Sequence, residues 1–344
     1  MPRTPSEALL AWSGRAFSSA EARPSRDAGL INRTYVVGDP PAAILQWVAP
    51  IFERTIHYDI EAVTARLAAQ RLPTPRLVPT DAEELWLDDD EGCWRILTYI
   101  PGVTVHRAEN VARARAAGSL LGRFHCALAD WERDFATPPR QVHDTPQRMA
   151  ELEAALAGCD GHALAARARG IGNEILAAWR SWEGDLDLPT RACHGDPKIS
   201  NLRFAADGRG VCLVDLDTLG DLPLAVEMGD AWRSWCNPVG EDAPEHAELD
   251  LDLFAAAATG WLSEVGEIDP AEQASLVPGI ERIALELAAR FCTDAVLNIY
   301  FREDRERFPD LGAHNLVRAR GQLRLARSCR ERRVACEAIL RSAR

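Results

Sequence analysis

The sequence predicts an α+β fold with two lobes, a small mixed α/β N-terminal lobe and a larger, mainly helical C-terminal lobe. Its 344 residues exceed what most single hydrophobic cores contain. Short strand-like runs and one amphipathic helix fill residues 1–100, whereas helical periodicity dominates the rest. Pro101-Gly102 separates the two patterns. We therefore place the lobes at residues 1–100 and 101–344.

The N-terminal lobe is expected to contain a small sheet and one helix. Strands at 35–37 and 43–48 flank a turn at Gly38-Asp-Pro-Pro, which is typical of a hairpin. A helix over 59–70 follows, because its apolar residues recur at helical spacing. The remaining predicted strands cover residues 76–79, 85–87 and 94–100.

The C-terminal lobe is expected to be mostly helical, with short strands and loops only over 191–217. The last predicted helix is amphipathic and rich in arginine, so it fits either a helix packed within the lobe or part of an interface. The chain is accordingly expected to be a monomer or a homodimer. The predicted helices cover residues 108–130, 145–156, 163–182, 251–265, 270–301 and 311–340.

Composition and charge exclude several classes of protein. Hydrophobic residues make up 47% of the chain, and no apolar run reaches the roughly 18 residues of a membrane helix. Residues 1–20 lack the basic start and apolar stretch of a signal peptide, so we expect a cytoplasmic protein without a membrane span. The nine cysteines contain no CxxC pair, which argues against a disulfide framework or a zinc site. A net charge of −13 argues against nucleic acid as a partner.

Six polar residues cluster in the sequence between positions 194 and 217. The first four form the pattern H-G-D-x-K-x-x-N, which runs into a predicted hairpin of strands at 202–204 and 211–214. The second strand delivers Asp215 at its end, so the hairpin holds carboxylates at both ends. The six residues are His194, Asp196, Lys198, Asn201, Asp215 and Asp217.

This set fits phosphoryl transfer from ATP. Such a reaction needs a carboxylate that orients the attacking hydroxyl, and oxygen ligands that hold Mg²⁺ on the phosphates. Asp196 suits the first role, and Asn201 with Asp215 suits the second. Lys198 could place a compact cation where charge develops on the phosphoryl group. His194 is expected to bond backbone groups within the loop.

Lys198 is the only lysine of a chain that has 38 arginines. Arginine is a bidentate fork, whereas lysine is a compact point charge. A single retained lysine therefore indicates a site that the fork does not fit, with a surface lysine left by chance as the alternative. Its position between Asp196 and Asn201 favours the first interpretation.

The loop of His194, Gly195, Asp196 and Asn201 and the strand end Val214-Asp215-Leu216 match two motifs of a known family. On these motifs the sequence resembles the aminoglycoside phosphotransferase and choline kinase family, small-molecule kinases with a protein-kinase-like fold. The likeness extends over nearly the whole chain to the N-acetylhexosamine 1-kinase-like branch, in which a lysine at position 198 is usual. Gly195 departs from that branch and matches the wider family. The matching segments include residues 29–35, 44–46, 94–102, 143–146, 215–218, 229–231, 285–294 and 314–316.

The resemblance implies a nucleotide site in the N-terminal lobe. Its hairpin residues are Gly29, Asn32 and Thr34, and its hinge residues, whose backbone meets adenine, are Leu97, Tyr99 and Ile100. The strand lysine that grips the phosphates in protein-kinase-like folds is replaced by Gln46, so the matching helix acid, Glu61, has no lysine to pair with. Either Gln46 contacts phosphate as a neutral donor, or a nearby arginine such as Arg33 takes over.

The resemblance also implies the activity. We expect an ATP- and Mg²⁺-dependent kinase that phosphorylates a hydroxyl of a small polar substrate, most specifically the anomeric hydroxyl of an N-acetylhexosamine sugar. Arg290 and Asp294 match the sugar pocket of the branch, although an Arg and an Asp at i, i+4 can also form a local ion pair.

Two alternatives to a sugar kinase stay open at this stage. An aminoglycoside or amino-alcohol phosphotransferase belongs to the same class, since an acidic cleft suits cationic substrates too. A nucleotide-binding pseudokinase that acts on a protein partner belongs to another class, with Gln46 as its mark. The joint presence of Asp196, Asn201 and Asp215 argues against the pseudokinase.

Overall fold

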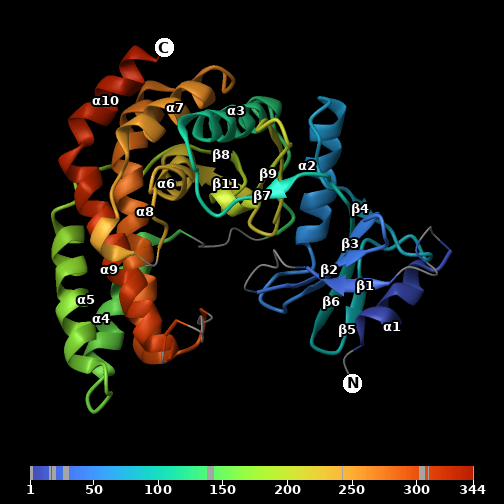
Figure 1. Cartoon of the computed structure of the whole chain (residues 1–344), viewed down its shortest axis with the longest axis horizontal. Helices are drawn as coiled ribbons and strands as arrows, with labels where there is room; N and C mark the ends of the chain where they lie inside the picture. Colours follow the sequence, from blue (N-terminus) through green and yellow to red (C-terminus); the bar gives the residue numbers. More distant parts are fainter. Residues whose placement is uncertain are drawn as a thin grey trace.

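The computed structural model describes residues 3–14, 17, 21–25, 31–137, 143–241, 243–301, 307–308 and 310–343. Figure 1 shows two lobes, with a sheet of N-terminal strands in one and a large group of helices in the other. The predicted fold class, a small mixed lobe and a larger helical lobe, is confirmed.

The small lobe is built on an antiparallel sheet. Its strands are β1 (Ala22–Pro24), β2 (Arg33–Val37), β3 (Ala43–Val48), β4 (Leu77–Val78), β5 (Leu87–Asp89) and β6 (Gly92–Thr98). The order is β1-β2-β3-β6-β4, and β5 also pairs with β6. One face of the sheet carries Leu45, Trp47, Trp94 and Ile96, which pack with Trp12 into a separate small core. The strands expected at 35–37, 43–48 and 76–79 are confirmed, and the one expected at 94–100 lies two residues earlier. The strand expected at 85–87 is wrong in its bounds, since β5 begins at Leu87, and β1 was not expected.

Helix α2 (Ile56–Ala69) packs against the other face, where Ile60 and Val63 join Leu97 in the main core. The helix predicted over 59–70 is thus confirmed and begins three residues earlier. The short segment α1 (Pro5–Leu9) with the 3-10 turn η1 (Leu10–Trp12) was not expected from periodicity, because it is too short to show one.

The large lobe is mainly helical. Its helices are α3 (Val111–Ala127), α4 (Thr145–Gly158), α5 (Ala165–Arg180), α6 (Leu224–Trp235), α7 (Leu251–Leu262), α8 (Pro270–Leu297), α9 (Leu311–Glu331) and α10 (Arg333–Ser342). Its strands and 3-10 turns are β7 (Val103–Thr104), β8 (Thr190–Cys193), η2 (Ile199–Asn201), β9 (Leu202–Phe204), β10 (Gly210–Leu213), β11 (Gly220–Pro223) and η3 (Pro244–His246). Strands β9 and β10 form the predicted hairpin, and β7 extends it on the far side of β9. Figure 1 shows β7, β8, β9 and β11 between the large helices and the small lobe.

Helix α8 is the centre of the large lobe, where α4, α5, α6 and α9 pack against it. Its predicted extension to residue 301 is wrong, since it ends at Leu297. Asn298 adopts the left-handed conformation, with φ 54°. The Asp294 carboxylate then accepts hydrogen bonds from the backbone N–H groups of residues 299, 300 and 301 and turns the chain away. The left-handed Asn298 and the Asp294 side chain therefore end this helix together.

Helix α6 is missing from the sequence-based helices. It is buried on nearly every side, and its charged residues Glu227, Asp230 and Arg233, which recur every three residues, are buried as well. Its backbone touches that of α8. A Cβ atom at Gly229 would lie 2.5 Å from the carbonyl oxygen of Gly279, and a Cβ at Gly279 would lie 2.1 Å from that of Ala225. Glycine at both positions is therefore what permits the close approach of the two helices.

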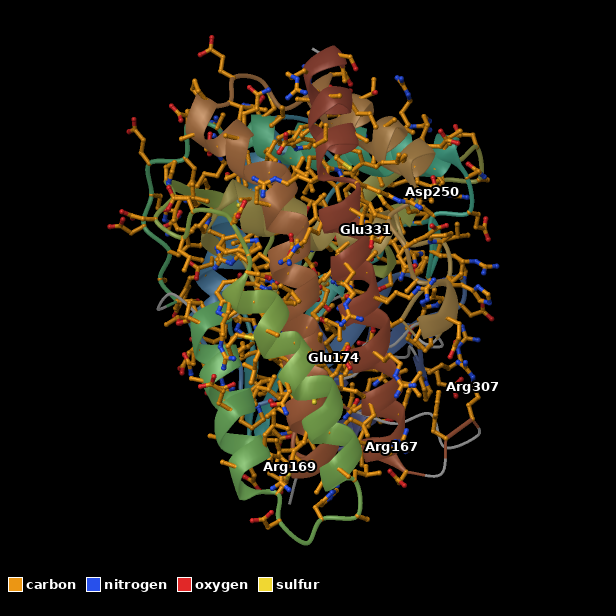
Figure 2. All side chains as sticks on the ribbon, turned by 90° about the vertical axis from the view of Figure 1, so that its left-hand side faces the viewer. Arg167, Arg169, Glu174, Asp250, Arg307 and Glu331 are labelled. Atoms are coloured by element: carbon orange, nitrogen blue, oxygen red, sulfur yellow. The ribbon has the colours of Figure 1, made fainter. Side chains whose placement is uncertain are left out.

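The helix predicted over 311–340 is two helices, α9 and α10, which meet at Arg332. Four of the arginines in this stretch bind carboxylates of the same chain, which supports packing within the lobe. Figure 2 shows this side of the lobe, where Glu174 of α5 faces α9. The pairs are Arg327–Glu174 at 2.6 Å, Arg332–Glu248 at 2.6 Å, Arg333–Glu337 at 3.0 Å and Arg330–Glu281.

Within the described residues, no helix combines the length and the apolar character that a membrane span requires.

The close contact between α6 and α8 predicts that Gly279→Ala is destabilising. The added methyl group must push the helices apart, which costs about 1–3 kcal/mol of the free energy of unfolding. Gly170→Ala is the matched control, because Gly170 is exposed on α5 and no heavy atom lies within 4 Å of the place that its Cβ would take. There the change should stabilise by about 0.5–1 kcal/mol. Urea unfolding measures both, and equal effects of the two substitutions would contradict the packing account.

Candidate active site

The loop between β8 and η2 is shaped by its own residues. Gly195 has φ 82°, and a Cβ at this position would lie 2.2 Å from the carbonyl oxygen of Thr218. The His194 ring bonds backbone groups at both nitrogens, to the Val214 carbonyl at 3.0 Å and from the Asp196 N–H at 3.3 Å. His194 thus has the structural role expected of it. Gly195, which departs from the N-acetylhexosamine branch, is required here by the backbone.

Helix α6 anchors the loop through Glu227, a buried carboxylate. Its two oxygens accept the backbone N–H groups of His194 and Gly195, each at 2.9 Å. Burial disfavours the ionised carboxylate, but the hydrogen bonds from the His125 ring and from the Gly195 backbone outweigh it and lower the pKa of Glu227. The backbone preceding Asp196 is therefore tied to the most buried helix of the lobe.

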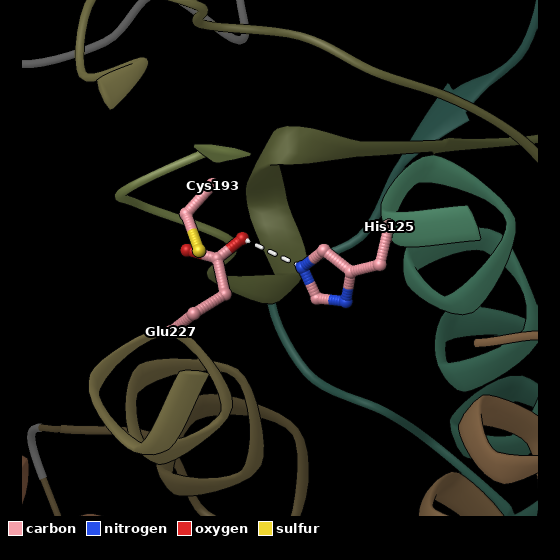
Figure 3. A group of neighbouring side chains, drawn as sticks. All are labelled: His125, Cys193 and Glu227. Carbon is pink, nitrogen blue, oxygen red and sulfur yellow. Dashed lines mark hydrogen bonds and ion pairs between the residues drawn. The ribbon is translucent and has the colours of Figure 1, made fainter. Parts of the chain in front are cut away.

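His125, Cys193 and Glu227 form a buried group that could be mistaken for a metal site (Figure 3). The indole of Trp261 donates to His125 Nδ1 at 3.0 Å, so Nε2 carries the hydrogen and donates to Glu227 at 3.3 Å. Burial and the charge of Glu227 raise the pKa of the Cys193 thiol well above its usual value, which keeps it protonated. His125 Nε2 and Cys193 Sγ thus both carry hydrogens and are not free to bind a metal. The three residues instead form a hydrogen-bonded group that anchors the loop.

A second anchor reaches the loop from helix α8 and from the residues at the start of α4. His143 Nδ1 lies 2.9 Å from Glu286 Oε1, and its Nε2 lies 3.2 Å from the carbonyl oxygen of Gly195. Both partners are acceptors, so the ring must be a doubly protonated imidazolium. Burial disfavours that charge, but the charge and hydrogen bond of Glu286 raise the pKa of His143. Thr145 donates to the other oxygen of Glu286 at 2.6 Å and completes the group.

Asp196 lies at the end of this anchored loop. Its Oδ2 accepts the ammonium of Lys198 and, at 3.1 Å, the side-chain amide of Asn201. Burial alone would favour the neutral acid, but the charge and hydrogen bond of Lys198 lower the pKa of Asp196. The same pair raises the pKa of Lys198 despite its burial. Asp196 is thus held as a carboxylate, and its Oδ1 has no hydrogen-bond donor among the described residues.

Asp215 follows β10 with φ 64°, an uncommon conformation for an aspartate. Its carboxylate has no hydrogen-bond partner among the described residues. Burial raises its pKa, and Asp217 and Asp196 raise it further against the opposing charge of Lys198. Asn201 is its neighbour, since the Val214 N–H donates to the Asn201 carbonyl at 2.8 Å. The Asn201 side chain turns its amide hydrogens to Asp196 and leaves Oδ1 available. One carboxylate and one amide oxygen, both uncommitted, fit the hard oxygen ligands that Mg²⁺ prefers.

Asp217 is the third carboxylate of the site, and its partners come from the small lobe. Arg95 of β6 binds it with two hydrogen bonds of 2.6 and 2.9 Å, with both side chains 1% exposed. The amide of Asn32 donates to it at 2.7 Å, and Asn32 Oδ1 accepts the Ala49 N–H at 3.0 Å. Burial opposes the charge, but Arg95 lowers the pKa of Asp217. The two lobes therefore meet in a buried ion pair.

The other expected nucleotide residues lie around this pair. Gln46 Oε1 accepts two hydrogen bonds from Arg95, of 3.0 and 2.8 Å, and its amide donates to Thr34 Oγ1 at 3.2 Å. Glu61 is turned away and pairs with Arg76 at 2.6 Å. Gly29 lies outside the described residues.

The hinge connects β6 to the large lobe. Tyr99 donates its backbone N–H to the Ala42 carbonyl at 3.4 Å, whereas Leu97 pairs with both β3 and β4 within the sheet. Arg203 of β9 binds the carbonyl of Ile100 at 3.4 Å and stacks over the Tyr99 ring at 6.0 Å. An arginine of the large lobe thus fixes the hinge, a contact that no sequence pattern indicated.

Arg290 and Asp294 do not form the ion pair that their spacing allows. The guanidinium of Arg290 lies over the rings of Tyr300 and Phe301, at 5.2 and 5.6 Å. Asp294 is 2% exposed and accepts the amide of Asn315 at 3.0 Å besides its three backbone bonds. Both side chains therefore shape the segment that follows α8.

Two further groups near the loop have polar atoms without partners among the described residues. Arg233 donates twice to Asp230 Oδ1, at 3.1 and 2.6 Å, and the buried Oδ2 of Asp230 has no hydrogen bond. The charge of Asp230 acts on both Lys198 and His143. Arg282 likewise has an unpaired Nη1 while it binds Thr145 and the His143 carbonyl.

Two cavities of about 350 and 300 Å³ lie elsewhere, on the helical lobe. The larger is lined by Arg167 and Arg307, which Figure 2 labels. Neither cavity includes a residue of the 194–217 cluster, so the chemistry places the candidate site at the junction of the lobes instead.

The comparisons with known proteins agree with this geometry. Residues 25–264 match the sequence model described as the phosphotransferase enzyme family. No curated protein matches the chain. A solved structure of amicoumacin kinase hAmiN in complex with AMP-PNP, Ca²⁺ and Ami is similar, with a TM-score of 0.61, 14% identity and coverage of 92% of this chain and 91% of that chain.

Two other solved structures are similar over nearly their whole length. An aminoglycoside phosphotransferase from Alicyclobacillus acidocaldarius has a TM-score of 0.58 and 15% identity, with 96% of this chain and 97% of that chain covered. A choline/ethanolamine kinase family protein from Mesorhizobium loti has a TM-score of 0.57 and 17% identity, with 98% of each chain covered. At these identities the likeness concerns the fold.

The His143–Glu286 pair predicts a pH-dependent stability. A histidine whose pKa is raised by folding contributes stability that is complete below its unfolded pKa, near 6.5, and is lost as the pH rises through the folded pKa. Each unit of raised pKa contributes about 1.4 kcal/mol. His143→Gln should therefore lower the free energy of unfolding more at pH 6 than at pH 9.

Urea unfolding of the wild type, His143→Gln and Glu286→Gln at both pH values measures this. Glu286→Gln is the matched control, because it removes the carboxylate that raises the pKa and should abolish the same pH dependence. A difference between wild type and His143→Gln that stays constant from pH 6 to pH 9 would show that His143 is not held as an imidazolium.

Proposed function

Because the chain belongs to the phosphotransferase enzyme family, we propose that it transfers the γ-phosphoryl group of ATP to a hydroxyl of an uncharged sugar, with the anomeric hydroxyl of an N-acetylhexosamine as the first candidate. The family membership makes the chain an enzyme that phosphorylates hydroxyl groups of small molecules. The observation that carries the proposed phosphoryl transfer is Asp196, an ionised carboxylate with one free oxygen beside the two uncommitted oxygen ligands of Asn201 and Asp215.

In the proposed reaction Asp196 Oδ1 accepts a hydrogen bond from the acceptor hydroxyl and orients its oxygen. The bond between this oxygen and the γ-phosphorus forms as the bond from that phosphorus to the bridging oxygen of ADP breaks, and the hydroxyl proton passes to Asp196. Lys198 keeps the carboxylate ionised before the step. Its ammonium is also within the influence of Asp215, which supports a position beside the phosphoryl group.

Asn201 and Asp215 are the residues that would hold Mg²⁺. When bound, Mg²⁺ neutralises negative charge on the phosphate oxygens. The solved amicoumacin kinase, which contains AMP-PNP and Ca²⁺, supports a nucleotide together with a divalent ion. We assign the nucleotide to the lobe of residues 1–100, against the hinge at Leu97 to Ile100 and beneath the hairpin of Gly29, Asn32 and Thr34. The acceptor is assigned to the lobe of residues 101–344.

The charges around the loop support an uncharged acceptor. Asp196 is paired with Lys198, Asp230 with Arg233, and Glu286 with protonated His143. Arg282 and Arg290 add two cations on α8 without an ion pair among the described residues. A polycationic substrate therefore gains little attraction here, although the whole chain is acidic. Unpaired Asp230 Oδ2 and Arg282 Nη1 are an acceptor and a donor of the kind that sugar hydroxyls satisfy.

Arg290 and Asp294 enter the proposal in different ways. Arg290 remains a candidate to contact the sugar. The carboxylate of Asp294 accepts hydrogen bonds from the backbone of residues 299–301 and from Asn315. We therefore propose that Asp294 shapes the acceptor site by holding residues 299–301 in place.

An aminoglycoside or amino alcohol is the second candidate acceptor. It is favoured by the buried Asp230 Oδ2, which a substrate ammonium could bind as well as a hydroxyl could. The names of two structural neighbours, an aminoglycoside phosphotransferase and a choline/ethanolamine kinase family protein, point the same way. A cytoplasmic location is part of the proposal, since the nine cysteines are all free.

The test is an ADP-release screen with ATP, Mg²⁺ and a panel of acceptors, followed by phosphorus NMR of any product. N-acetylglucosamine and N-acetylgalactosamine are expected to stimulate ADP release, and glucosamine, choline and kanamycin are not. Stimulation by kanamycin or choline alone would establish the second candidate and contradict the sugar.

The substitution Asp196→Asn tests whether Asp196 is the base in this reaction. It should lower kcat by about 10²- to 10⁴-fold, because the amide cannot take the hydroxyl proton. Binding of ADP with Mg²⁺ should stay within about threefold of the wild type by calorimetry, since Asp196 faces the acceptor. Wild-type turnover in this variant would refute Asp196 as the base.

A further inference from the structure

We propose that Arg95 is the cation that binds the nucleotide phosphates in this chain, in place of the strand lysine that Gln46 replaces. The inference rests on the proposed function, because it requires that the chain binds ATP. It goes beyond the resemblance, which left open either Gln46 itself or a nearby arginine, with Arg33 as the example. Five features of the structure carry it.

The first feature is the register of the sheet. Strands β3 and β6 are antiparallel, and Gln46 lies directly opposite Arg95. Opposed residues share a face, and so do residues two apart on one strand. The face of Gln46 and Arg95 is therefore also that of Ile44 and Leu97, of which Leu97 is expected at the adenine. The cation Arg95 therefore lies on β6, next to the β3 position of the usual strand lysine and on the same face of the sheet.

The second feature is the unsatisfied capacity of the guanidinium, which has five N–H donors. Nε and one donor of Nη2 point at Gln46, while the other donor of Nη2 and one of Nη1 bind Asp217. The second hydrogen of Nη1 has no acceptor among the described residues. One N–H of the guanidinium is thus left for an acceptor beyond the described residues.

The third feature is the replacement of a whole ion pair. In protein-kinase-like folds the strand lysine is held by a helix carboxylate. Here helix α2 presents His57 to Arg95, and burial together with the charge of Arg95 lowers the pKa of His57 to about 4, so the ring is neutral. The carboxylate comes instead from Asp217 of the large lobe. Glu61 does not take part, because it pairs with Arg76.

The fourth feature is the position of Arg95 relative to the proposed metal site. Asp217 is two residues from Asp215, and the charge of Asp215 acts on Arg95 as well. Asp215 would hold the metal, and a phosphate group bound there would lie on the same side of the site as the guanidinium. Arginine suits this task, since its fork can bind a carboxylate and a phosphate oxygen at the same time.

The fifth feature is the position of the other cations considered. Arg33 is paired with Trp47, and its guanidinium lies 4.3 Å from the centre of that ring on the opposite face of the sheet. Lys198 is bound to Asp196, and Arg203 is bound to the hinge carbonyls. Arg95 is the one of these four that faces both Gln46 and Asp217.

The experiment measures the contribution of the phosphates to binding, as the ratio of the Kd of adenosine to the Kd of ADP with Mg²⁺, by calorimetry. Arg95→Gln should lower this ratio by about 10- to 100-fold, the effect of one charge-assisted contact. Adenosine itself should bind with unchanged Kd, since the hinge is intact. Arg33→Gln is the matched control and should leave the ratio unchanged.

The inference is overturned if folded Arg95→Gln keeps the wild-type ratio, or if it loses adenosine and ADP affinity in parallel, which would indicate a structural role only. Should Arg95→Gln not fold, Arg95→Lys takes its place, because it keeps the charge for Asp217 but lacks the fork. It should lower the ratio by at least about threefold, and an unchanged ratio overturns the inference. A wild-type chain that binds neither nucleoside nor nucleotide would refute the proposed function instead.

Discussion

Like-charge repulsion among three carboxylates, Asp196, Asp215 and Asp217, is the constraint on which this site depends. Three negative charges in a small, largely buried volume are unfavourable unless each one is compensated. Lys198 and Asn201 compensate Asp196, and Arg95 and Asn32 compensate Asp217. Asp215 alone has no protein partner among the described residues, and it is the one whose pKa is raised. Lys198 and Arg95 thus each neutralise one of the three carboxylates, and the proposed Mg²⁺ would neutralise Asp215.

The same compensation sets the positions of the two lobes. Both partners of Asp217 come from the small lobe, so the carboxylate cannot be neutralised unless the sheet of β1 to β6 docks on the β9–β10 hairpin. From the other side, Glu227 and the His143–Glu286 pair hold the backbone of residues 194 and 195. The loop is therefore fixed by the buried helices before any ligand binds. Such preorganisation is what phosphoryl transfer requires of a protein that contributes position and charge more than covalent chemistry.

The sequence predicted the parts whose signal is local. Spacing alone identified the loop and its hairpin, because residues 194–217 are contiguous and their strands short and regular. Helix α6 was not predicted, although its charged residues recur at helical spacing and two of them, Glu227 and Asp230, lie near the loop. Arg95 was not predicted for another reason. Its proposed role depends on the register between β3 and β6 and on its partner Asp217, which is 122 residues away in the sequence. The end of α8 was missed although Asn298, which caps it in the left-handed conformation, is a residue type that often ends helices. The hydrogen bonds of Asp294 to the backbone beyond it could not be predicted from sequence.

The central claim is that Asp215 is the uncompensated carboxylate that takes the divalent ion. Electron paramagnetic resonance of Mn²⁺, used in place of Mg²⁺, measures this directly in the presence of ADP. The account predicts that the wild type sequesters Mn²⁺ with ADP and that Asp215→Asn weakens this by at least about tenfold, the equivalent of 1.4 kcal/mol. Asp207→Asn, on the exposed turn of the same hairpin, should leave it unchanged. Equal Mn²⁺ binding by the wild type and Asp215→Asn would contradict the account.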